Sequence, residues 1–194
     1  MKTKKLYYAI SLILLAAAAP VAAGPSGQAL AFTCAGCHGT DGSSVGPASP
    51  HIAGLDPEYF VETMQAYQGE ERNPSIMGRI ARGYTDEQLE SMAAYFAEQK
   101  VRLQPQQHDA AKAKMGAEIH DEYCEKCHED GGKNSEAGIL AGQWVPYLQF
   151  TWEDFMSEKR EMTKKMGSKV RSMEKDHGDA GFEALINFYA SQDK

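Results

Sequence analysis

The motif Cys-x-x-Cys-His occurs twice in this chain, at residues 34–38 and 124–128, and the two copies contain all four cysteines. This spacing is the attachment signature of c-type haem, in which two thiols bond covalently to the porphyrin and the adjacent histidine coordinates the iron. The sequence therefore predicts two covalently bound haem c groups. The expected attachment residues are Cys34, Cys37, Cys124 and Cys127, and the expected iron ligands are His38 and His128.

Three other uses of paired cysteines fit this pattern less well. A zinc ribbon needs its two Cys-x-x-Cys units about 15–20 residues apart so that both reach one metal ion, whereas Cys34 and Cys124 are 90 residues apart. A thioredoxin-like site would place one unit between a strand and a helix. Structural disulfides would not need the two adjacent histidines. Covalent haem attachment is therefore the preferred interpretation.

The first 23 residues have the pattern of a secretory signal peptide. Lys2, Lys4 and Lys5 form a basic start, residues 6–19 are mainly apolar, and small residues precede a predicted cleavage site after Ala23. A membrane-spanning helix needs about 20 continuous apolar residues, and this run is shorter. We therefore expect an exported, soluble protein, which in a bacterium means the periplasm, with no stable membrane insertion.

The chain is acidic, with 27 Asp and Glu against 20 Lys and Arg and a formal net charge of −7. Removal of the signal peptide takes away three of those lysines, which leaves 17 basic residues against 27 acidic ones and a net charge of −10. Because nucleic-acid binding needs a basic surface, this function is not expected.

An internal repeat extends well beyond the two motifs. Ile52-Ala53-Gly54 recurs as Leu140-Ala141-Gly142, 88 residues later. At the same offset, apolar residues share the i, i+4, i+7 spacing of one helical face. They are Phe60, Met64 and Tyr67 in the first copy, and Leu148, Trp152 and Phe155 in the second. Each copy ends in a further apolar helical stripe. These stripes are Leu89, Met92, Ala93 and Phe96, and then Phe182, Leu185, Ile186 and Tyr189.

Helix start signals and a polar linker complete the expected organisation. Asp56-Pro57 predicts a helix with an aspartate cap and proline in its first position, and Thr85 with Gln88 predicts a capping box. A polar, proline-containing linker surrounds Gln104. We expect an all-α fold of two tandem cytochrome c domains, each wrapped around one haem. The expected ranges are 1–23 for the signal peptide, 24–103 for domain 1 and 104–194 for domain 2.

The sixth iron ligands are predicted from the repeat. Met77 lies 39 residues after His38, and Met166 lies 38 residues after His128, each within a Met-Gly segment. A c-type haem with His and Met ligands has a raised potential suited to electron transfer. Met162 remains an alternative to Met166, because both lie in the same short segment. Ligation by two histidines also stays open, without support from the repeat.

Other residues near the motifs carry weaker signals. Pro47, nine residues after His38, is a candidate to offer its carbonyl to the second ring nitrogen of that histidine. The second copy has Ala137 at the equivalent spacing, so equal potentials for the two haems are not assumed. The other histidines have no partner at metal-ligand spacing and are expected at the surface or as helix caps. They are His51, His108, His120 and His177.

The two copies, with their distal methionines, resemble the dihaem cytochromes of the c4 type over the whole mature chain. A closer resemblance is to the dihaem cytochrome subunit of flavocytochrome c sulfide dehydrogenases. It is carried by residues 34–40 (CAGCHGT), 45–50 (VGPASP), 76–81 (IMGRIA), 123–128 (YCEKCH), 139–144 (ILAGQW), 146–149 (PYLQ) and 188–192 (FYASQ).

This resemblance implies a partner. A flavoprotein subunit would form a heterodimer with this chain, oxidise sulfide at a disulfide and FAD, and pass electrons to the two haems. A small cytochrome c is one implied downstream acceptor. The chain itself has no G-x-G-x-x-G nucleotide motif and no spare cysteine, so it is not expected to be catalytic alone.

Two function classes stay open. The preferred one is the electron-transfer subunit of a sulfide dehydrogenase, and the alternative is a free c4-like shuttle to a membrane oxidase or another reductase. A haem peroxidase needs an open iron position, and methionine at both irons argues against it. Trp144, which has no aromatic counterpart in the first copy, is interpreted either as a cover for the second haem or as an anchor for a flavoprotein.

Overall fold

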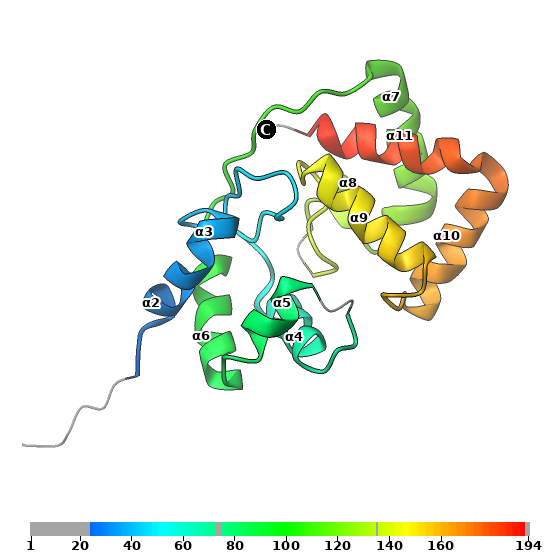
Figure 1. The fold of residues 1–194 in the computed structure, drawn as a ribbon. Coiled ribbons are helices and arrows are strands. Elements are labelled where there is room, and N and C mark those ends of the chain that lie inside the picture. The colour runs from blue at the N-terminus through cyan, green and yellow to red at the C-terminus, as the bar shows by residue number, and fades with distance from the viewer. Residues whose placement is uncertain (1–23, 73–74, 135, 193–194) are drawn as a thin grey trace, which may run out of the picture.

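The computed structural model describes residues 24–72, 75–134 and 136–192 (Figure 1). The predicted signal peptide at 1–23 lies outside the described residues. The first half contains α2 (Gly27–Ala31), η1 (Phe32–Cys34), α3 (Ala35–His38), α4 (Pro57–Gln68), α5 (Ile76–Ala81) and α6 (Asp86–Ala97). The second half contains α7 (Ala110–Ile119), η2 (His120–Cys124), α8 (Glu129–Gly132), α9 (Val145–Met156), α10 (Lys164–His177) and α11 (Asp179–Ala190).

The predicted all-α fold is confirmed. In the described ranges, β-pairing is limited to one isolated antiparallel bridge between Arg72 and Arg160. Over the same ranges, the structure has no helix with the length and apolar character needed to cross a membrane.

The helix starts that the sequence predicted in the first half are confirmed. At α4, the Asp56 carboxylate accepts from the Tyr59 amide at 3.0 Å, and Pro57 occupies the first turn. At α6, the Thr85 hydroxyl accepts from the Gln88 amide at 3.4 Å, and the Gln88 side chain accepts from the Thr85 amide at 3.1 Å. A cap of this kind contributes about 1 kcal/mol to the free energy of unfolding.

In each half, the first helix packs closely against the last helix. Helix α2 packs on α6 in the first half, and α7 packs on α11 in the second. A Cβ atom at Gly27 would collide with the carbonyl of Ser91, and one at Gly116 would collide with the carbonyl of Ala184. Because interiors are close-packed, a larger residue at either glycine would force the two helices apart. The repeat therefore extends to the packing of the terminal helices.

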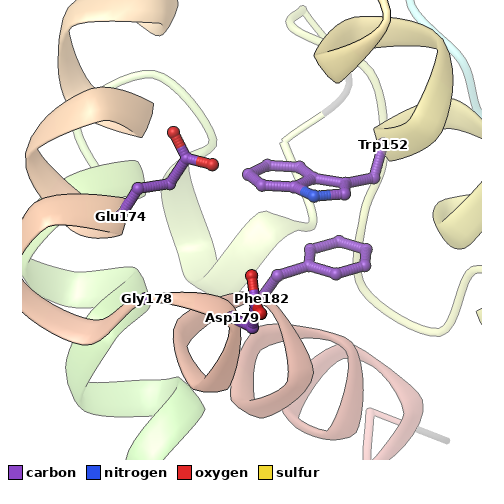
Figure 2. Close-up of a pocket in the computed structure, with 5 residues that line it drawn as sticks. All are labelled: Trp152, Glu174, Gly178, Asp179 and Phe182. Carbon is purple, nitrogen blue, oxygen red and sulfur yellow. The ribbon is translucent and has the colours of Figure 1, made fainter.

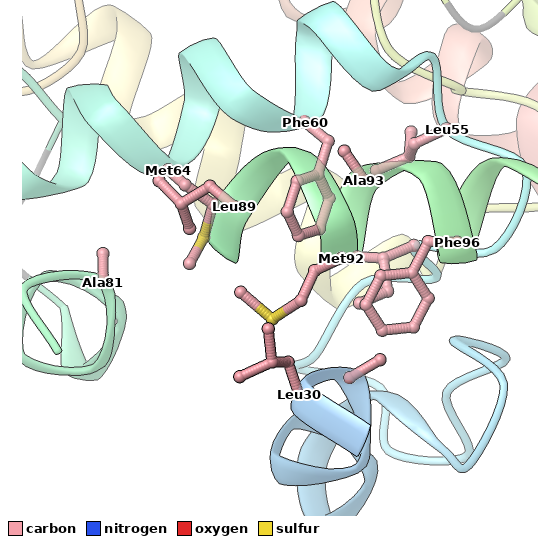
Figure 3. Close-up of a cluster of buried hydrophobic side chains, with 11 residues drawn as sticks. Leu30, Leu55, Phe60, Met64, Ala81, Leu89, Met92, Ala93 and Phe96 are labelled. Carbon is pink, nitrogen blue, oxygen red and sulfur yellow. The ribbon is translucent and has the colours of Figure 1, made fainter. Parts of the chain in front are cut away.

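Each half has its own hydrophobic core. In the first, Leu89, Met92 and Phe96 of α6 have no exposed surface, and Figure 3 shows Phe60 and Met64 of α4 facing them. Burying one such side chain stabilises the folded state by about 1.5–3 kcal/mol relative to leaving it exposed. The second core consists of Ile119, Tyr123, Leu148, Met173, Ala184, Leu185, Ile186 and Tyr189. Both predicted terminal stripes are buried, except that Phe182 is only partly so.

The two halves are joined by the segment after the second loop. Gln143 is 3% exposed and binds the backbone of His51, accepting from its amide at 2.8 Å and donating to its carbonyl at 3.2 Å. The Trp144 ring stacks on the His51 ring with 5.7 Å between centroids, and its indole donates to the Ser44 carbonyl at 3.3 Å. Trp144 therefore contacts the first half of the molecule, and its two interpretations, as a cover for the second haem or as an anchor for a flavoprotein, stay predictions.

The connection from α6 to α7 contains no helix over residues 98–109. It is attached to both halves, since the Arg102 amide donates to the Ser43 hydroxyl at 3.0 Å and the Gln106 side chain donates to the Gln143 carbonyl at 3.0 Å. The domain boundary near Gln104 stays a prediction.

Candidate haem sites

The first motif forms a short helical turn. Cys34 ends η1, and Cys37 and His38 lie in α3. The His38 residue is 7% exposed, and its Nδ1 lies 2.8 Å from the Pro50 carbonyl oxygen. When Nδ1–H donates to that carbonyl, Nε2 keeps the free lone pair that an iron would take.

The carbonyl that contacts His38 belongs to Pro50, so the prediction for Pro47 was wrong. The loop closes on the Gly42 carbonyl, which accepts from the amides of residues 52 and 53 at 2.8 and 3.1 Å. Gly42 has a φ of 86°, which residues with a side chain rarely adopt. This closure places the returning chain, and Pro50 with it, against the histidine.

The second motif repeats the arrangement with one difference. The Gly132 carbonyl closes its loop in the same way, accepting from the amides of residues 140 and 141 at 2.8 and 3.0 Å. Gly138 stands at the position of Pro50, and its backbone lies near His128. Nδ1 of His128 is nevertheless buried without a completed hydrogen bond. His38 therefore has a backbone partner for its Nδ1 and His128 does not. The residue that corresponds to Pro50 in the second copy is Gly138, not Ala137.

The environment of both histidines favours the neutral ring. Burial lowers the pKa of His38 and of His128, and the backbone at Pro50 and Gly138 opposes this effect only in part. Neutral imidazole is the form that coordinates a metal.

The four cysteines are free thiols in this structure, and Cys37 and Cys127 are exposed. Burial raises the pKa of Cys34, and it raises the pKa of Cys124 to about 11. A thioredoxin-like nucleophile needs the opposite shift. No cluster of three or more His, Cys, Asp or Glu side chains that suits a metal ion occurs in the part of the chain that the structure describes. These observations weigh against the thioredoxin and zinc interpretations.

Met77 and Met166 occupy equivalent places. Met77 lies in the first turn of α5, where its amide donates to the Ser75 hydroxyl at 3.2 Å. Met166 lies in the first turn of α10, where its amide donates to the Thr163 hydroxyl at 3.2 Å. Met162 precedes the cap of that helix. The geometry favours Met166 over Met162, and both methionine assignments stay predictions.

Of the four other histidines, His51 lies neither at the surface nor at a helix end, which contradicts the expectation for it. His120 is buried, but it is the C-cap residue of α7 and so agrees with the expectation of a helix cap. His51 is 5% exposed and His120 is 2% exposed. His108 is exposed, and His177 ends α10. Both ring nitrogens of His51 are buried without a hydrogen bond. Because buried polar atoms nearly always have a partner, a polar substituent of a bound haem fits beside them.

His120 belongs to a buried network beside the second motif. Its Nε2 lies 2.8 Å from Glu125 Oε2, and its Nδ1 lies 2.8 Å from the Tyr189 hydroxyl. Burial raises the pKa of Tyr189 well above its usual value, so the hydroxyl keeps its proton. The repeat places three apolar residues at these positions in the first half, namely Leu30, Ala35 and Phe96. Sequence reasoning missed this network, although a position-by-position comparison of the two copies shows the exchange.

Replacing Glu125 with glutamine is expected to make stability less dependent on pH in the acid range. The pKa of Glu125 is lowered, chiefly by the hydrogen bond from the Gly131 amide. Burial acts in the opposite direction, whereas His120 and the Asp130 amide lower the pKa further. A depressed pKa gives stability that is present above the pKa of the unfolded chain and is lost as pH falls through the folded value.

The melting temperature of Glu125→Gln should therefore lie below that of the wild type at pH 7, and the two should converge below about pH 4. The exposed Glu118→Gln on α7 is the matched control and should follow the wild type at every pH. Thermal melts of the haem-loaded protein across this range make the comparison. If the melting temperatures of Glu125→Gln and the wild type differ by the same amount at every pH, the charge of the Glu125 carboxylate does not contribute to stability.

A cavity of about 250 Å³ opens between α9, α10 and α11 (Figure 2). Its lining residues are Trp152, Glu174, Gly178, Asp179 and Phe182. The Trp152 and Phe182 rings stack with 4.4 Å between centroids and 10° between planes.

Comparisons with known proteins identify the family of this chain. Residues 25–100 match the cytochrome c family. Over 153 residues the chain is 31% identical to cytochrome c4 of Azotobacter vinelandii, covering 70% of this chain and 73% of that protein. Over 70 residues it is 43% identical to the cytochrome subunit of sulfide dehydrogenase of Chlorobaculum tepidum. That alignment covers 36% of this chain and 63% of the relative's length.

A solved structure matches across both halves. Reduced recombinant cytochrome c4 from Pseudomonas stutzeri superposes with a TM-score of 0.72 at 26% identity, covering 88% of this chain and 100% of that one. The chain therefore belongs to the cytochrome c family and, within it, to the dihaem cytochromes of the c4 type, which are electron-transfer proteins with two covalently bound haem c groups.

Proposed function

We propose that this cytochrome is the electron-transfer subunit of a periplasmic flavocytochrome c sulfide dehydrogenase. A flavoprotein subunit that carries FAD oxidises sulfide, and this chain accepts the electrons and passes them to a downstream acceptor such as a small cytochrome c. The chain is not catalytic by itself. The sequence likeness to the Chlorobaculum tepidum subunit supports the choice of donor.

Exposed apolar side chains around the first motif carry the proposal. Phe32 is 51% exposed, Val45 is 80% exposed and Ile76 is 61% exposed. Phe32 lies in η1 beside the first cysteine, Val45 lies in the loop after His38, and Ile76 precedes Met77. A permanent subunit interface needs an apolar face, whereas transient redox contacts are small and guided by charge. These exposed apolar side chains near the first motif support the proposal of a lasting partner.

The site residues have the following proposed roles. Thioether bonds form at Cys34, Cys37, Cys124 and Cys127, and the iron ligands are His38 with Met77 and His128 with Met166. A bound haem supplies one-electron chemistry, with its iron alternating between the ferric and ferrous states. Pro50 orients the first histidine through its Nδ1. The apolar residues of each half would limit the access of water to a haem held there, which would influence its potential.

A free c4-like shuttle to a membrane oxidase or another reductase is the second candidate. It is favoured by the alignment with cytochrome c4, which covers 70% of the chain, against 36% for the sulfide dehydrogenase subunit. The two candidates differ in how long the partner stays bound.

The test is to mix the purified dihaem protein with the candidate flavoprotein and sulfide, and to follow haem reduction by stopped-flow spectroscopy. We expect faster reduction than with sulfide alone, and elution of the two proteins as one complex. Equal reduction rates together with separate elution would rule out the subunit proposal and favour the free shuttle.

A matched pair of variants locates the docking face. Phe32 and Phe150 are 51% and 53% exposed, in the first and the second half respectively. Phe32→Ser is expected to weaken flavoprotein binding by about tenfold, because aromatic anchors dominate interfaces, while Phe150→Ser should bind as the wild type does. Equal binding by both variants would place the docking face elsewhere. Haem absorbance and circular dichroism verify that each variant is folded.

A further inference from the structure

The second haem site has charged residues at positions where the first site has exposed apolar ones. At the offset of 89 residues that relates the two predicted methionine ligands, Ile76 and Ile80 correspond to Lys165 and Lys169. The two isoleucines are 61% and 36% exposed, and both lysines are exposed as well. The surface next to the predicted sixth ligand is therefore apolar in the first half and positively charged in the second.

A position beside the haem motifs shows the same exchange. Phe32 lies two residues before the first cysteine of its motif and is 51% exposed. Glu122 lies two residues before Cys124 and is also exposed. The apolar side chains that support a lasting partner at the first motif are therefore not repeated at the corresponding positions of the second half.

The positive charge of the second site is concentrated on α10. Residues 164–171 contain four basic side chains and no acidic one, although the chain as a whole has a formal net charge of −7. All four are exposed, and none of them takes part in the ion pairs of the described residues. These four residues form what we call the second-site basic patch: Lys164, Lys165, Lys169 and Arg171.

The patch adjoins the second motif. The Lys169 ammonium donates to the Glu122 carbonyl at 3.2 Å and lies 5.8 Å from the centroid of the Tyr123 ring. Tyr123 directly precedes Cys124, and α10 packs against η2 along this side (Figure 1). A protein docked on the patch would therefore lie next to the motif to which the second haem is attached.

Nearby carboxylates offset only part of this charge. Asp121 and Glu122 are exposed on η2, and Asp176 of α10 accepts a hydrogen bond from the Tyr123 hydroxyl at 2.9 Å. At 3.6 residues per turn, Lys164 and Arg171 lie on the flank of α10 opposite to Lys169. Their charges are therefore separated from the carboxylates of η2, and the patch remains positive.

The chemistry of the patch fits a soluble redox protein better than a lipid surface. A helix that lies on a membrane inserts apolar side chains below its charged face, whereas the apolar side of α10 is used in the second core through Met173. Transient redox contacts are small and are guided by charge. A negatively charged protein would be repelled by most of this acidic chain and attracted at the patch, which would orient the encounter.

We infer that the second-site basic patch is the docking surface for the downstream electron acceptor, and that this acceptor is a small redox protein with an acidic surface. One electron passes from a ferrous haem of this protein to the oxidised centre of the acceptor, so the haem becomes ferric and no bond is made or broken. The inference deepens the proposed function and rests on it only for the direction of electron flow. Either candidate donor satisfies it.

Changing Lys165 and Lys169 together to glutamine is expected to slow electron transfer to an acidic acceptor by about tenfold at low ionic strength, because charge steering raises association rates by about 10–10³-fold. The probe is plant plastocyanin, an acidic copper protein. The chemically reduced dihaem protein is mixed with cupric plastocyanin, and haem oxidation is followed by stopped-flow spectroscopy. The wild-type rate should fall as the ionic strength rises from about 0.01 M to about 0.15 M, since the Debye length shrinks from about 30 Å to about 8 Å.

A matched variant removes the same charge elsewhere. Lys100 and Lys114 are exposed on the connection and on α7, and their joint change to glutamine should leave the rate as in the wild type. Loss of positive charge near a haem favours its ferric state and so increases the driving force for donation, which means that a slower rate reports docking. Chemical-shift titration of cadmium-substituted plastocyanin, which cannot accept an electron, should show the same loss of affinity.

Haem absorbance and circular dichroism verify that each variant is folded. If the variant at Lys165 and Lys169 does not fold, the joint change of Lys164 and Arg171 to glutamine provides the test. Equal rates for the patch variant and the control, or a wild-type rate that does not fall with salt, would overturn the inference. Because no sulfide or flavoprotein is present, this result is separate from the test of the donor.

A lipid surface is distinguished by vesicles of phosphatidylglycerol. The wild type and the patch variant should bind such vesicles equally weakly at an ionic strength of about 0.15 M. Vesicle binding that the patch variant loses, together with unchanged electron transfer to plastocyanin, would assign the patch to an anionic membrane and overturn its assignment to a protein acceptor.

Discussion

Replacing Met77 with alanine is expected to remove about half of the weak near-red absorption band of the ferric protein, because this band reports a methionine sulfur on haem iron and one of two such bonds is lost. The potential of the first haem should also fall, since methionine ligation raises it. The expected fall is on the order of 0.1 V, within the range of about 0.8 V over which axial ligands set haem potentials. Near-red absorbance and redox titration of the purified protein measure both effects.

The second half contains its own control for this experiment. Met166→Ala should reduce the same band by a similar amount, whereas Met162→Ala should leave it intact, because only Met166 shares the capped first-turn position of Met77. Loss of the band in Met162→Ala with retention in Met166→Ala would reverse the assignment in the second half.

Changing Cys34 and Cys37 together to serine is expected to give a protein with a single covalent haem. Serine cannot form a thioether bond, so the first half can then no longer hold a covalent haem. Cys124 and Cys127 changed to serine should give the complementary single-haem protein. Intact-mass spectrometry of each variant counts the haems. Two haems in either double variant would show that attachment does not depend on these motifs.

The fold was predictable because its signals are local and occur twice. The cap at Asp56 and the capping box of Thr85 with Gln88 each lie within four residues of sequence, so their chemistry could be read directly. The closure of the first loop on Gly42 is a longer-range event, since the partner amides lie at residues 52 and 53. This is why Pro47 was chosen by spacing, while Pro50 makes the contact.

The differences between the copies were harder to predict than their likeness. Trp144 was recognised as lacking a counterpart, but its stacking on His51 depends on how the two halves meet, which no local pattern specifies. His120 was assigned to the surface or to a helix cap because it has no partner at metal-ligand spacing, and it does end α7 as its C-cap. Its partners Tyr189 and Glu125 are brought to it by the packing of α7 against α11 and by the turn of the second motif. Isolated polar residues in a repeat are therefore best compared with their apolar counterparts.

Acid-acetone extraction of the purified wild-type protein, followed by intact-mass spectrometry, tests the central assignment most directly. Covalent attachment at residues 34–38 and 124–128 predicts that the colour stays with the protein and that the mass exceeds that of the mature chain by two haem groups. Extraction of the colour into the solvent, or a mass with fewer than two haems, would contradict the assignment.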